Sequence, residues 1–353
     1  MDVMSGLIKF VRSIKSGDRV AVYHHTDTDG LCSSVIAAKA IERLIGRKIN
    51  LQLVSGQNVI IITPAIIRKL KSARITKLIC TDLCIDENPI TVKEVEKFAD
   101  ILVIDHHKLY HNISSPKTVF IKSVMITSAY YPASKMAYDL FLRIVNISDL
   151  DWLAAAGTIA DGAYKEWRNF VDAIAKKYCY VIKGDVIYSE FYSKLEGISF
   201  AENLGKENEC YKILYNSNFR DITSRIAKYE IVRDEIKKWI SAFEKKAEFL
   251  PKDLVFYEFS PTYKIKSHVI NVICSKFPHK TLIVIVPDGL FYYNISARRS
   301  DKKVAVNDLL TEATKGLKNA SGGGHVPAAG GRIRKVDLKK FKQNVMAQLK
   351  IKI

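Results

Sequence analysis

The stretch RVAVYHHTDTDG, residues 19–30, joins an apolar run to a cluster of acidic and histidine side chains. Its first part, 19–25, is typical of a buried strand, and the helical pattern SSVIAAKAIERLI follows at 33–45. Two further strand-like runs are KLICTDL at 77–83, which the helical segment PAIIRKLKSAR precedes, and DILVIDHH at 100–107. Apolar strands separated by helices predict an α/β fold with a parallel sheet that carries helices on both faces.

The rest of the chain predicts a second domain and a helical connection to it. The 353 residues are too many for one ordinary core. The segment DITSRIAKYEIVRDEIKKWISAFEKKAEFL is long, charged and of helical period, and β-like runs such as TLIVIVPDG and LFYYNISA come after it. We therefore expect a first domain at 1–220, a connecting helix at 221–250 and a smaller C-terminal α/β domain at 251–353.

Composition is that of a soluble globular protein, with 48% hydrophobic and 26% charged residues. No apolar run approaches the ~20 residues that a membrane span needs, and the N-terminal stretch, which Lys9, Arg12 and Lys15 interrupt, does not resemble a signal peptide. We expect a cytoplasmic protein without a membrane partner. The six scattered cysteines lack the two pairs of a zinc ribbon, so we expect reduced, mostly buried thiols.

The net charge of +18 is concentrated toward the C-terminus, where residues 298–353 hold 14 basic and 4 acidic side chains. Such an excess attracts polyanions, among them nucleic acids. A highly charged, soluble surface is the alternative explanation, and charge alone does not decide between the two.

Acidic and histidine residues fall at the carboxyl ends of all three predicted strands: HTDTDG at 25–30, Asp82, and DHH at 105–107. Ligands of open α/β sheets bind just outside these strand ends. Carboxylates gathered there repel one another unless cations are present, and mixed Asp and His ligands suit Mn²⁺ and, less well, Mg²⁺ or Zn²⁺. Each motif alone has a structural explanation, as a turn, a helix cap or a pair of core histidines. Their combination predicts a two-metal hydrolytic site.

Together with AAAGTIADG at 154–162, these motifs resemble the four N-terminal motifs of the DHH phosphoesterase superfamily, and SGGGHVPAAGG at 321–331 resembles the GGGH motif of the DHHA1 domain. The five motifs occur in the order of the family and span nearly the whole chain. The chain is similar in particular to the RecJ-like exonucleases and the oligoribonucleases (nanoRNases) of archaea and bacteria.

The resemblance implies two divalent cations, Mn²⁺ as the first expectation and Mg²⁺ as the alternative. It implies that His25 and Asp27 bind the first cation and that Asp82 bridges both. Asp29, His106 and Asp161 would then hold the second. It also implies that His107 faces the scissile phosphate and that Asp105 orients the histidines. Members of the family carry either His or Asp at the position of His25.

The C-terminal domain is expected to grip the substrate. Backbone N–H groups of Gly322, Gly323 and Gly324 could approach a phosphate, and His325 could add a hydrogen bond. The family places an arginine on a strand for phosphate, which Arg298 or its neighbour Arg299 matches. A flexible glycine turn and a solvated strand edge remain the structural alternatives. The aromatic run 291–293 could stack bases or pack in the core.

The function expected from this resemblance is a phosphodiesterase that hydrolyses single-stranded DNA or RNA from an end, with a replication or repair protein as a further partner. A phosphodiesterase for small substrates, such as nanoRNA, a cyclic dinucleotide or adenosine bisphosphate, is the enzymatic alternative. A non-catalytic RecJ-like replication scaffold is an alternative of another class, which the filled ligand positions disfavour. The GGGH motif argues against an inorganic pyrophosphatase. Polarity of digestion, sugar preference and oligomeric state are open.

Overall fold

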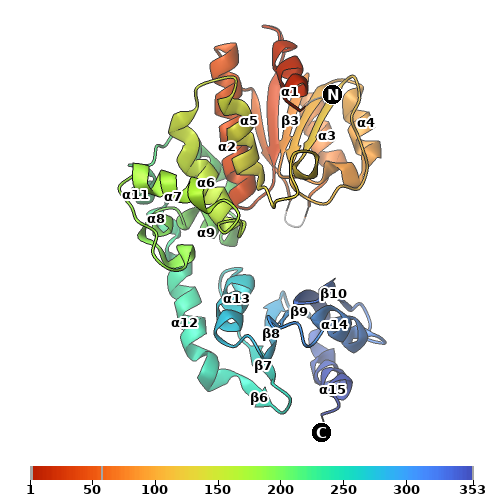
Figure 1. Cartoon of the computed structure of the whole chain (residues 1–353). Coiled ribbons are helices and arrows are strands. Elements are labelled where there is room, and N and C mark those ends of the chain that lie inside the picture. Colours follow the sequence, from red (N-terminus) through yellow and green to blue (C-terminus); the bar gives the residue numbers. More distant parts are fainter. Residues whose placement is uncertain (1–2, 57–58, 352–353) are drawn as a thin grey trace. The chain divides into compact units, whose positions relative to one another are not determined.

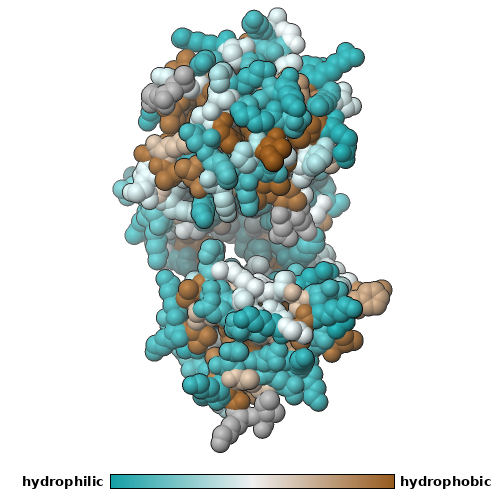
Figure 2. Space-filling model, turned by 90° about the vertical axis from the view of Figure 1, so that its right-hand side faces the viewer, coloured by the Kyte–Doolittle hydropathy of each residue, from teal (hydrophilic) through white to brown (hydrophobic). Residues whose placement is uncertain are grey.

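The computed structural model describes residues 3–56 and 59–351 of the chain. The chain divides into two compact units, Met1–Tyr229 and Glu230–Ile353, each with its own sheet (Figure 1). Within residues 3–56 and 59–351, no helix is long and apolar enough to cross a membrane. Hydrophilic residues cover most of the face of each unit that Figure 2 presents, with apolar residues scattered among them.

The sheet of the first unit has five parallel strands in the order β2-β1-β3-β4-β5. The strands are β1 Val20–His24, β2 Leu51–Val54, β3 Lys77–Thr81, β4 Asp100–Asp105 and β5 Thr118–Lys122. The three strands expected from the sequence are present at the centre of the sheet, and β2 and β5 form its two edges. Because all strands run in the same direction, their carboxyl ends meet along one edge, where the acidic motifs lie.

Helices cover both faces of this sheet, which confirms the predicted α/β class. On one face Ile66 and Leu70 of α3 and Val92 and Val95 of α4 pack on alternate residues of the strands, among them Tyr23. On the opposite face α2 and α5 lie against β1, β3 and β4 (Figure 1). These helices, with α1 at the N-terminal end, are α1 Val3–Arg12, α2 Thr28–Ile45, α3 Pro64–Ser72, α4 Pro89–Glu96 and α5 Ala133–Leu142.

The remainder of the first unit is helical, as the sequence predicts. Its helices are α6 Asp151–Ala160, α7 Arg168–Lys177, α8 Glu190–Ser193, α9 Gly197–Asn203, α10 Glu207–Tyr215 and α11 Ile222–Ile226. All six cysteines are free and five of them are buried, Cys179 being exposed.

The second unit is built on a mixed six-stranded sheet in the order β10-β11-β9-β8-β7-β6, in which only the pair β7 and β8 is parallel. Its elements are α12 Ile231–Lys246, β6 Glu248–Leu250, β7 Leu254–Glu258, α13 Lys266–Lys276, β8 Thr281–Asp288, β9 Tyr292–Arg298, α14 Val306–Thr314, β10 Ser321–His325, β11 Ala328–Arg334 and α15 Leu338–Gln348. Helices α14 and α15 share a core with one face of the sheet, through residues such as Leu310, Phe341 and Ile295.

The segment expected to form one connecting helix differs from the prediction. The single helix expected over 221–250 is α11, a 3-10 turn at Ala227–Tyr229, α12 and then β6. The helix stops early because residues 248–250 pair with β7 across a turn in which Lys252 and Asp253 have positive φ, so the sheet competes successfully for this segment. The glycine cluster 321–331, for which a flexible turn was the structural alternative, lies in strands β10 and β11, which pair from Ser321↔Arg332 to His325↔Ala328.

Candidate metal centre

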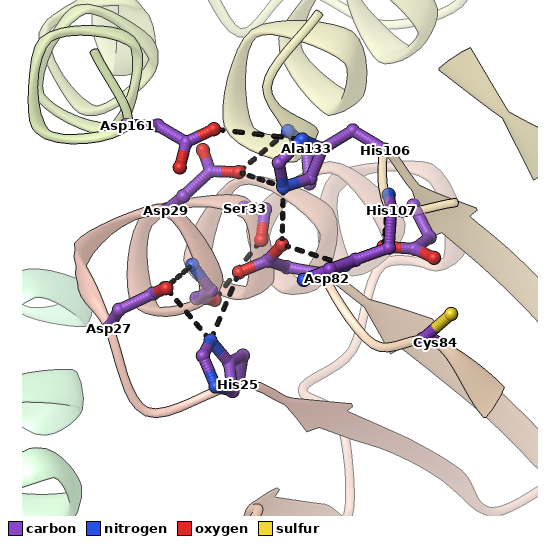
Figure 3. A network of polar contacts seen from close by, with 12 residues as sticks. His25, Asp27, Asp29, Ser33, Asp82, Cys84, His106, His107, Ala133 and Asp161 are labelled. Carbon is purple, nitrogen blue, oxygen red and sulfur yellow. Dashed lines mark hydrogen bonds and ion pairs between the residues drawn. The ribbon is translucent and has the colours of Figure 1, made fainter. Parts of the chain in front are cut away.

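The start of α2 places the first two acidic residues. Asp27 caps the helix, with its side chain accepting a hydrogen bond from the backbone N–H of Gly30 at 2.9 Å. A Cβ at Gly30 would lie 2.6 Å from the carbonyl oxygen of His25, so the tight turn between β1 and α2 requires glycine there. The sequence HTDTDG thus folds so that His25 and Asp27 lie side by side while Asp29 is carried on the first helical turn (Figure 3).

Asp82 follows β3 with a left-handed backbone, φ 57°, which is strained for most residues and which Asp tolerates better. Its N–H donates to the carbonyl of Ile104 at the end of β4, which fixes the turn. The side chain is 1% exposed and points to the centre of the cluster (Figure 3). A strained acidic residue held this way is typical of a functional site.

Ligand atoms converge in two groups, one that includes Asp82 and one whose His106 lies against it. In the first, the Nδ1 atom of His25 lies 2.8 Å from Asp27 Oδ2 and 3.6 Å from Asp82 Oδ2. In the second, the Nε2 atom of His106 lies 3.0 Å from Asp82 Oδ1, and its Nδ1 atom lies 3.6 Å from Asp161 Oδ2. The first group is His25, Asp27 and Asp82, and the second is Asp29, His106 and Asp161. The structure therefore brings together all six residues expected to hold cations.

Asp29 is positioned by elements far away in the sequence. Its two carboxylate oxygens accept hydrogen bonds from the backbone N–H groups of Ala133 and Ser134, at 2.7 and 2.9 Å, where α5 begins. A Cβ at Gly157 would come within 2.7 Å of Asp29 Oδ1, so the glycine of AAAGTIADG makes room for this carboxylate. No local pattern in the sequence indicates the contact with α5.

His107 points toward the cluster from the other side of Asp82. Its Nδ1 atom lies 2.7 Å from Asp105 Oδ1, while Asp82 Oδ1 is 3.7 Å away. Asp105 is fully buried and lies behind the histidine, which is the orienting position expected for it. With Nδ1 engaged, Nε2 of His107 is the nitrogen that can meet a ligand.

Crowding of acidic groups perturbs their protonation. Burial together with the charges of Asp27 and Asp29 raises the pKa of Asp82 well above its usual value, and burial also raises the pKa of Asp29. Burial and the charge of Asp29 raise the pKa of Asp161 to about 8. For His25, burial acts in the opposite direction, but the carboxylates of Asp27 and Asp82 raise its pKa to about 11.

The donor set fits divalent cations. Both carboxylate oxygens of Asp82, Nδ1 of His106 and Oδ2 of Asp161 are buried, and within the described ranges they lack a hydrogen-bond partner of good geometry. Buried polar atoms without partners are costly. These atoms face one another at ligand distances rather than pairing, which is the arrangement that Asp and His side chains adopt around a hard or borderline cation.

The two arginines and the histidine of the second unit that were expected to bind a phosphate differ in their contacts and exposure. Arg299 is 6% exposed, and its guanidinium is bonded to Asp301 and to the Thr281 hydroxyl, so it has a structural role. Arg298 points to the other face of the sheet, where its Nε donates to Asn271 of α13 at 3.2 Å. His325 is exposed at the end of β10 and lies in the same cross-strand row as Arg298, through Ala328.

Three glycines of β10 differ in what surrounds them. A Cβ at Gly322 would lie 2.5 Å from the carbonyl of Leu310, and one at Gly324 would lie 2.7 Å from the carbonyl of Ala328. At Gly323 a Cβ would meet nothing within 4 Å, and at its strand neighbour Gly330 only a carbonyl at 3.9 Å. The fold therefore requires Gly322 and Gly324, whereas Gly323 and Gly330 leave a bare, solvent-facing patch beside the row of Arg298 and His325.

The aromatic run at the start of β9 is divided. Phe291 is 73% exposed at the turn between β8 and β9, and the hydroxyl of Tyr293 donates to Glu258. The guanidinium of Arg332 lies over the ring of Tyr292 at 3.7 Å. Among these three, Phe291 is the residue whose ring is free to stack on a base.

Sequence reasoning missed several residues around the centre. The ring of Tyr130 lies edge-on to His106, with centroids 5.2 Å apart, and the hydroxyl of Thr26 donates to Glu202. A fully buried lysine, Lys122, lies behind Asp105. Tyr130 and Glu202 sit in segments without a motif, so only the fold brings them here.

Comparisons with known proteins identify the family of the two parts of the chain. The model of the DHH family N-terminal domain matches residues 19–161, and the model of the DHHA1 domain matches residues 252–350. In a comparison with curated proteins, no sequence matches this chain.

Solved structures share the fold. An exonuclease RecJ bound to manganese superposes with a TM-score of 0.73 at 16% identity, over 99% of this chain and 94% of that one. RecJ from Thermus thermophilus in complex with Mn²⁺ superposes with a TM-score of 0.71 at 15% identity. The match covers 98% of this chain and 54% of that longer protein. CDC45 from Entamoeba histolytica gives 0.61 at 10% identity, over 98% of both chains. At such identities the likeness concerns the fold alone.

Proposed function

The chain belongs to the DHH family and carries a DHHA1 domain after its DHH domain, and on this premise we propose that it is a metal-dependent phosphodiesterase that hydrolyses single-stranded nucleic acid from an end. One observation carries the proposal: the buried, strained carboxylate of Asp82 belongs to one group of Asp and His ligand atoms and lies 3.0 Å from His106 of the other. RecJ, which has the same fold, is an exonuclease whose structures contain manganese or magnesium.

Two cations would be held by the groups His25–Asp27–Asp82 and Asp29–His106–Asp161, and Asp82, whose Oδ1 lies 3.0 Å from His106 Nε2, is proposed as a ligand of both cations. When bound, divalent cations lower the pKa of water and neutralise the charge that develops on a phosphate. The choice of Mn²⁺ over Mg²⁺ is part of the proposal, and the histidine nitrogens in both groups favour it.

His107 would act on the substrate directly. Burial alone would lower its pKa, but Asp105 and Asp82 raise it, so the imidazole is protonated over a wider pH range than a free histidine. Its Nε2–H would then donate a hydrogen bond to a non-bridging phosphate oxygen as negative charge accumulates in the transition state. Asp105, with Oδ1 on Nδ1, would hold the ring in this orientation.

Substrate binding is proposed for the bare patch of the second unit. Arg298 and His325 offer N–H donors beside it, and Gly323 and Gly330 allow a phosphate or a sugar to approach the backbone closely. Arg299, whose guanidinium is already engaged with Asp301, is the weaker candidate of the two arginines. The basic excess of residues 298–353 favours a substrate with several phosphates.

A small-substrate phosphodiesterase is the second candidate, because Arg298 and His325 beside the patch are enough donors to bind a single phosphate. A replication scaffold finds support in the fold shared with CDC45. The complete ligand set argues against a purely non-catalytic role, since a scaffold has no need to keep unpaired buried carboxylates.

One time course tests these alternatives. The whole protein with Mn²⁺ or Mg²⁺ is incubated with DNA and RNA strands of 5 and 30 nucleotides, labelled at the 5′ or the 3′ end. We expect stepwise shortening from one end, faster on the long strand, and complete loss of activity in EDTA. Activity that persists in EDTA would exclude the metal-dependent mechanism. Equal efficiency on both lengths would instead favour the small-substrate enzyme.

A further inference from the structure

Behind His107 lies a buried lysine that no motif accounts for. Lys122, the last residue of β5, is 0% exposed. Its ammonium nitrogen lies 2.7 Å from Asp105 Oδ2 and 2.9 Å from Asp86 Oδ1. It also lies 3.1 and 2.8 Å from the backbone carbonyl oxygens of His107 and Lys108. A charge removed from water this completely is tolerated only when such partners surround it.

Asp105 and Asp86 also accept hydrogen bonds from the segment that begins with the histidine pair. Asp105 Oδ1 accepts a hydrogen bond from Nδ1 of His107 at 2.7 Å. Asp86 Oδ2 accepts from the backbone N–H groups of Tyr110 and His111, at 2.8 and 3.3 Å. The result is a continuous series of contacts, Asp86–Lys122–Asp105–His107. Through it the buried ammonium group of Lys122 fixes the position of residues 105–111.

Cys84, Asp86 and Asp105 offer three ligand atoms close enough to hold a metal ion. Lys122 already fills that position, because its ammonium nitrogen lies within 3.4 Å of a ligand atom from each of the three. The cluster is therefore an ammonium site rather than a third cation site. Its positive charge also helps to hold the pKa of the buried Asp105 below its usual value: burial would raise it, but His107 and Lys122 outweigh that effect.

We propose that Lys122 is a positioning residue of the hydrolytic site: it locks Asp105 and the backbone of 107–111, so that His107 keeps Nδ1 on Asp105 and directs Nε2 to the substrate. The role rests on the proposed function of His107. Lys122 itself touches no substrate, and it acts through the orientation of the imidazole. Losing such a supporting contact typically lowers activity about 10–100-fold.

A double-mutant cycle with His107 tests this role. Lys122→Met, which keeps the length of the side chain but removes its donors, is expected to lower kcat about 10–100-fold while KM changes less than about threefold. In the His107→Ala background the same change is expected to have little further effect on kcat, because the two residues act as one unit. An equal loss of kcat in both backgrounds would overturn the proposal, since it would mean that Lys122 acts without His107.

Lys77 provides the matched control. It is a lysine of the same sheet, 5% exposed at the start of β3, and pairs with Asp100 at 2.6 Å. Lys77→Met also breaks a buried ion pair, so it should lower the melting temperature while leaving kcat of the folded protein near that of the wild type. If Lys77→Met lowers kcat as much as Lys122→Met, loss of stability explains both and the positioning role is wrong.

Two further measurements keep the test decisive. Should Lys122→Met not fold, Lys122→Arg takes its place in the same cycle, because a planar guanidinium keeps the charge but cannot occupy the same point. The ¹⁵N and ¹H resonances of the His107 imidazole report the Nδ1–H bond to Asp105 without any turnover. Their shift toward free histidine in the Lys122 variant is expected even if the protein hydrolyses no phosphodiester, whereas unchanged resonances would refute the positioning role alone.

Discussion

At the scale of single residues, Asp82 joins the two halves of the centre. Its oxygens lie 3.6, 3.0 and 3.7 Å from ring nitrogens of His25, His106 and His107. Its positive φ costs free energy, of the order of 1 kcal/mol for an acidic residue that tolerates this region. The surrounding strands stabilise it because its N–H is bonded to Ile104. A single side chain thus links two groups of ligands that come from different strands.

Asp82→Asn is expected to reduce the hydrolytic rate more than about 100-fold while the fold is retained. Asn adopts the left-handed conformation as readily as Asp, but it removes the shared negative charge. In the metal-free protein the variant should melt at a higher temperature than the wild type, because it relieves the repulsion that raises the pKa of Asp82. Rates with Mn²⁺ and melting curves in EDTA measure both effects. A variant that keeps over about a tenth of the wild-type rate would remove Asp82 as the bridging residue.

The structure brings together the residues that belong to sequence motifs, whereas the sequence did not indicate residues that act through long-range contacts. Asp27 and Asp29 could be singled out because they follow an apolar strand, and Asp161 was expected from the resemblance of AAAGTIADG to a motif of the family. Lys122 could not, since a lysine after the apolar run TVFI is ordinarily a solvated strand end. Only the fold shows that Asp86 and Asp105 converge on it.

At the scale of elements, strand ends and helix starts build the site. The central strands could be predicted because their apolar runs are long, and the acidic residues at their carboxyl ends were expected to meet. The edge strands could not: LQLV of β2 is short and carries a polar residue, and β5 ends in a charge. The contact of Asp29 with the first N–H groups of α5 depends on tertiary packing, which no local pattern encodes.

Strand β10 allows its structural and binding roles to be separated. Gly322→Ala is expected to destabilise the second unit by about 1–3 kcal/mol, because the new Cβ would meet the carbonyl of Leu310 at 2.5 Å. Gly323→Ala should change stability by less than about 0.5 kcal/mol, since its Cβ meets open space. We expect it to raise KM several-fold by covering the bare patch. Chemical denaturation and steady-state kinetics on both variants measure this split. An unchanged KM in Gly323→Ala would show that the substrate does not approach this strand.

At the scale of the whole molecule, charge is distributed unevenly. The first unit buries a surplus of carboxylates at one sheet edge, and residues 298–353 carry ten more basic than acidic groups. Repulsion among the buried carboxylates works against folding of the metal-free protein. Cation binding relieves it, so folding stability and metal binding are linked.

This linkage gives a dependence on pH. The folded-state pKa of Asp161, about 8, lies above the value of about 3.8 expected when the chain is unfolded, and the pKa values of Asp29 and Asp82 are shifted in the same direction. At these groups the folded protein therefore binds more protons than the unfolded chain. Their contribution to stability is present at low pH and is lost as the pH rises to about 8. The raised pKa of His25 acts in the same sense.

We therefore expect the melting temperature in EDTA to fall between pH 6 and pH 8, and Mn²⁺ to raise it more at pH 8 than at pH 6, because the cation replaces the protons. At a cation concentration about a hundredfold above Kd, the increase should be about 5–10 °C. Calorimetric scans at several pH values, with and without Mn²⁺, measure both trends. Asp161→Asn serves as the control, since removing this carboxyl should flatten the curve in EDTA. A metal-free melting temperature that rises over this interval would contradict the linkage and with it the crowding of ionised carboxylates on which the metal centre is argued.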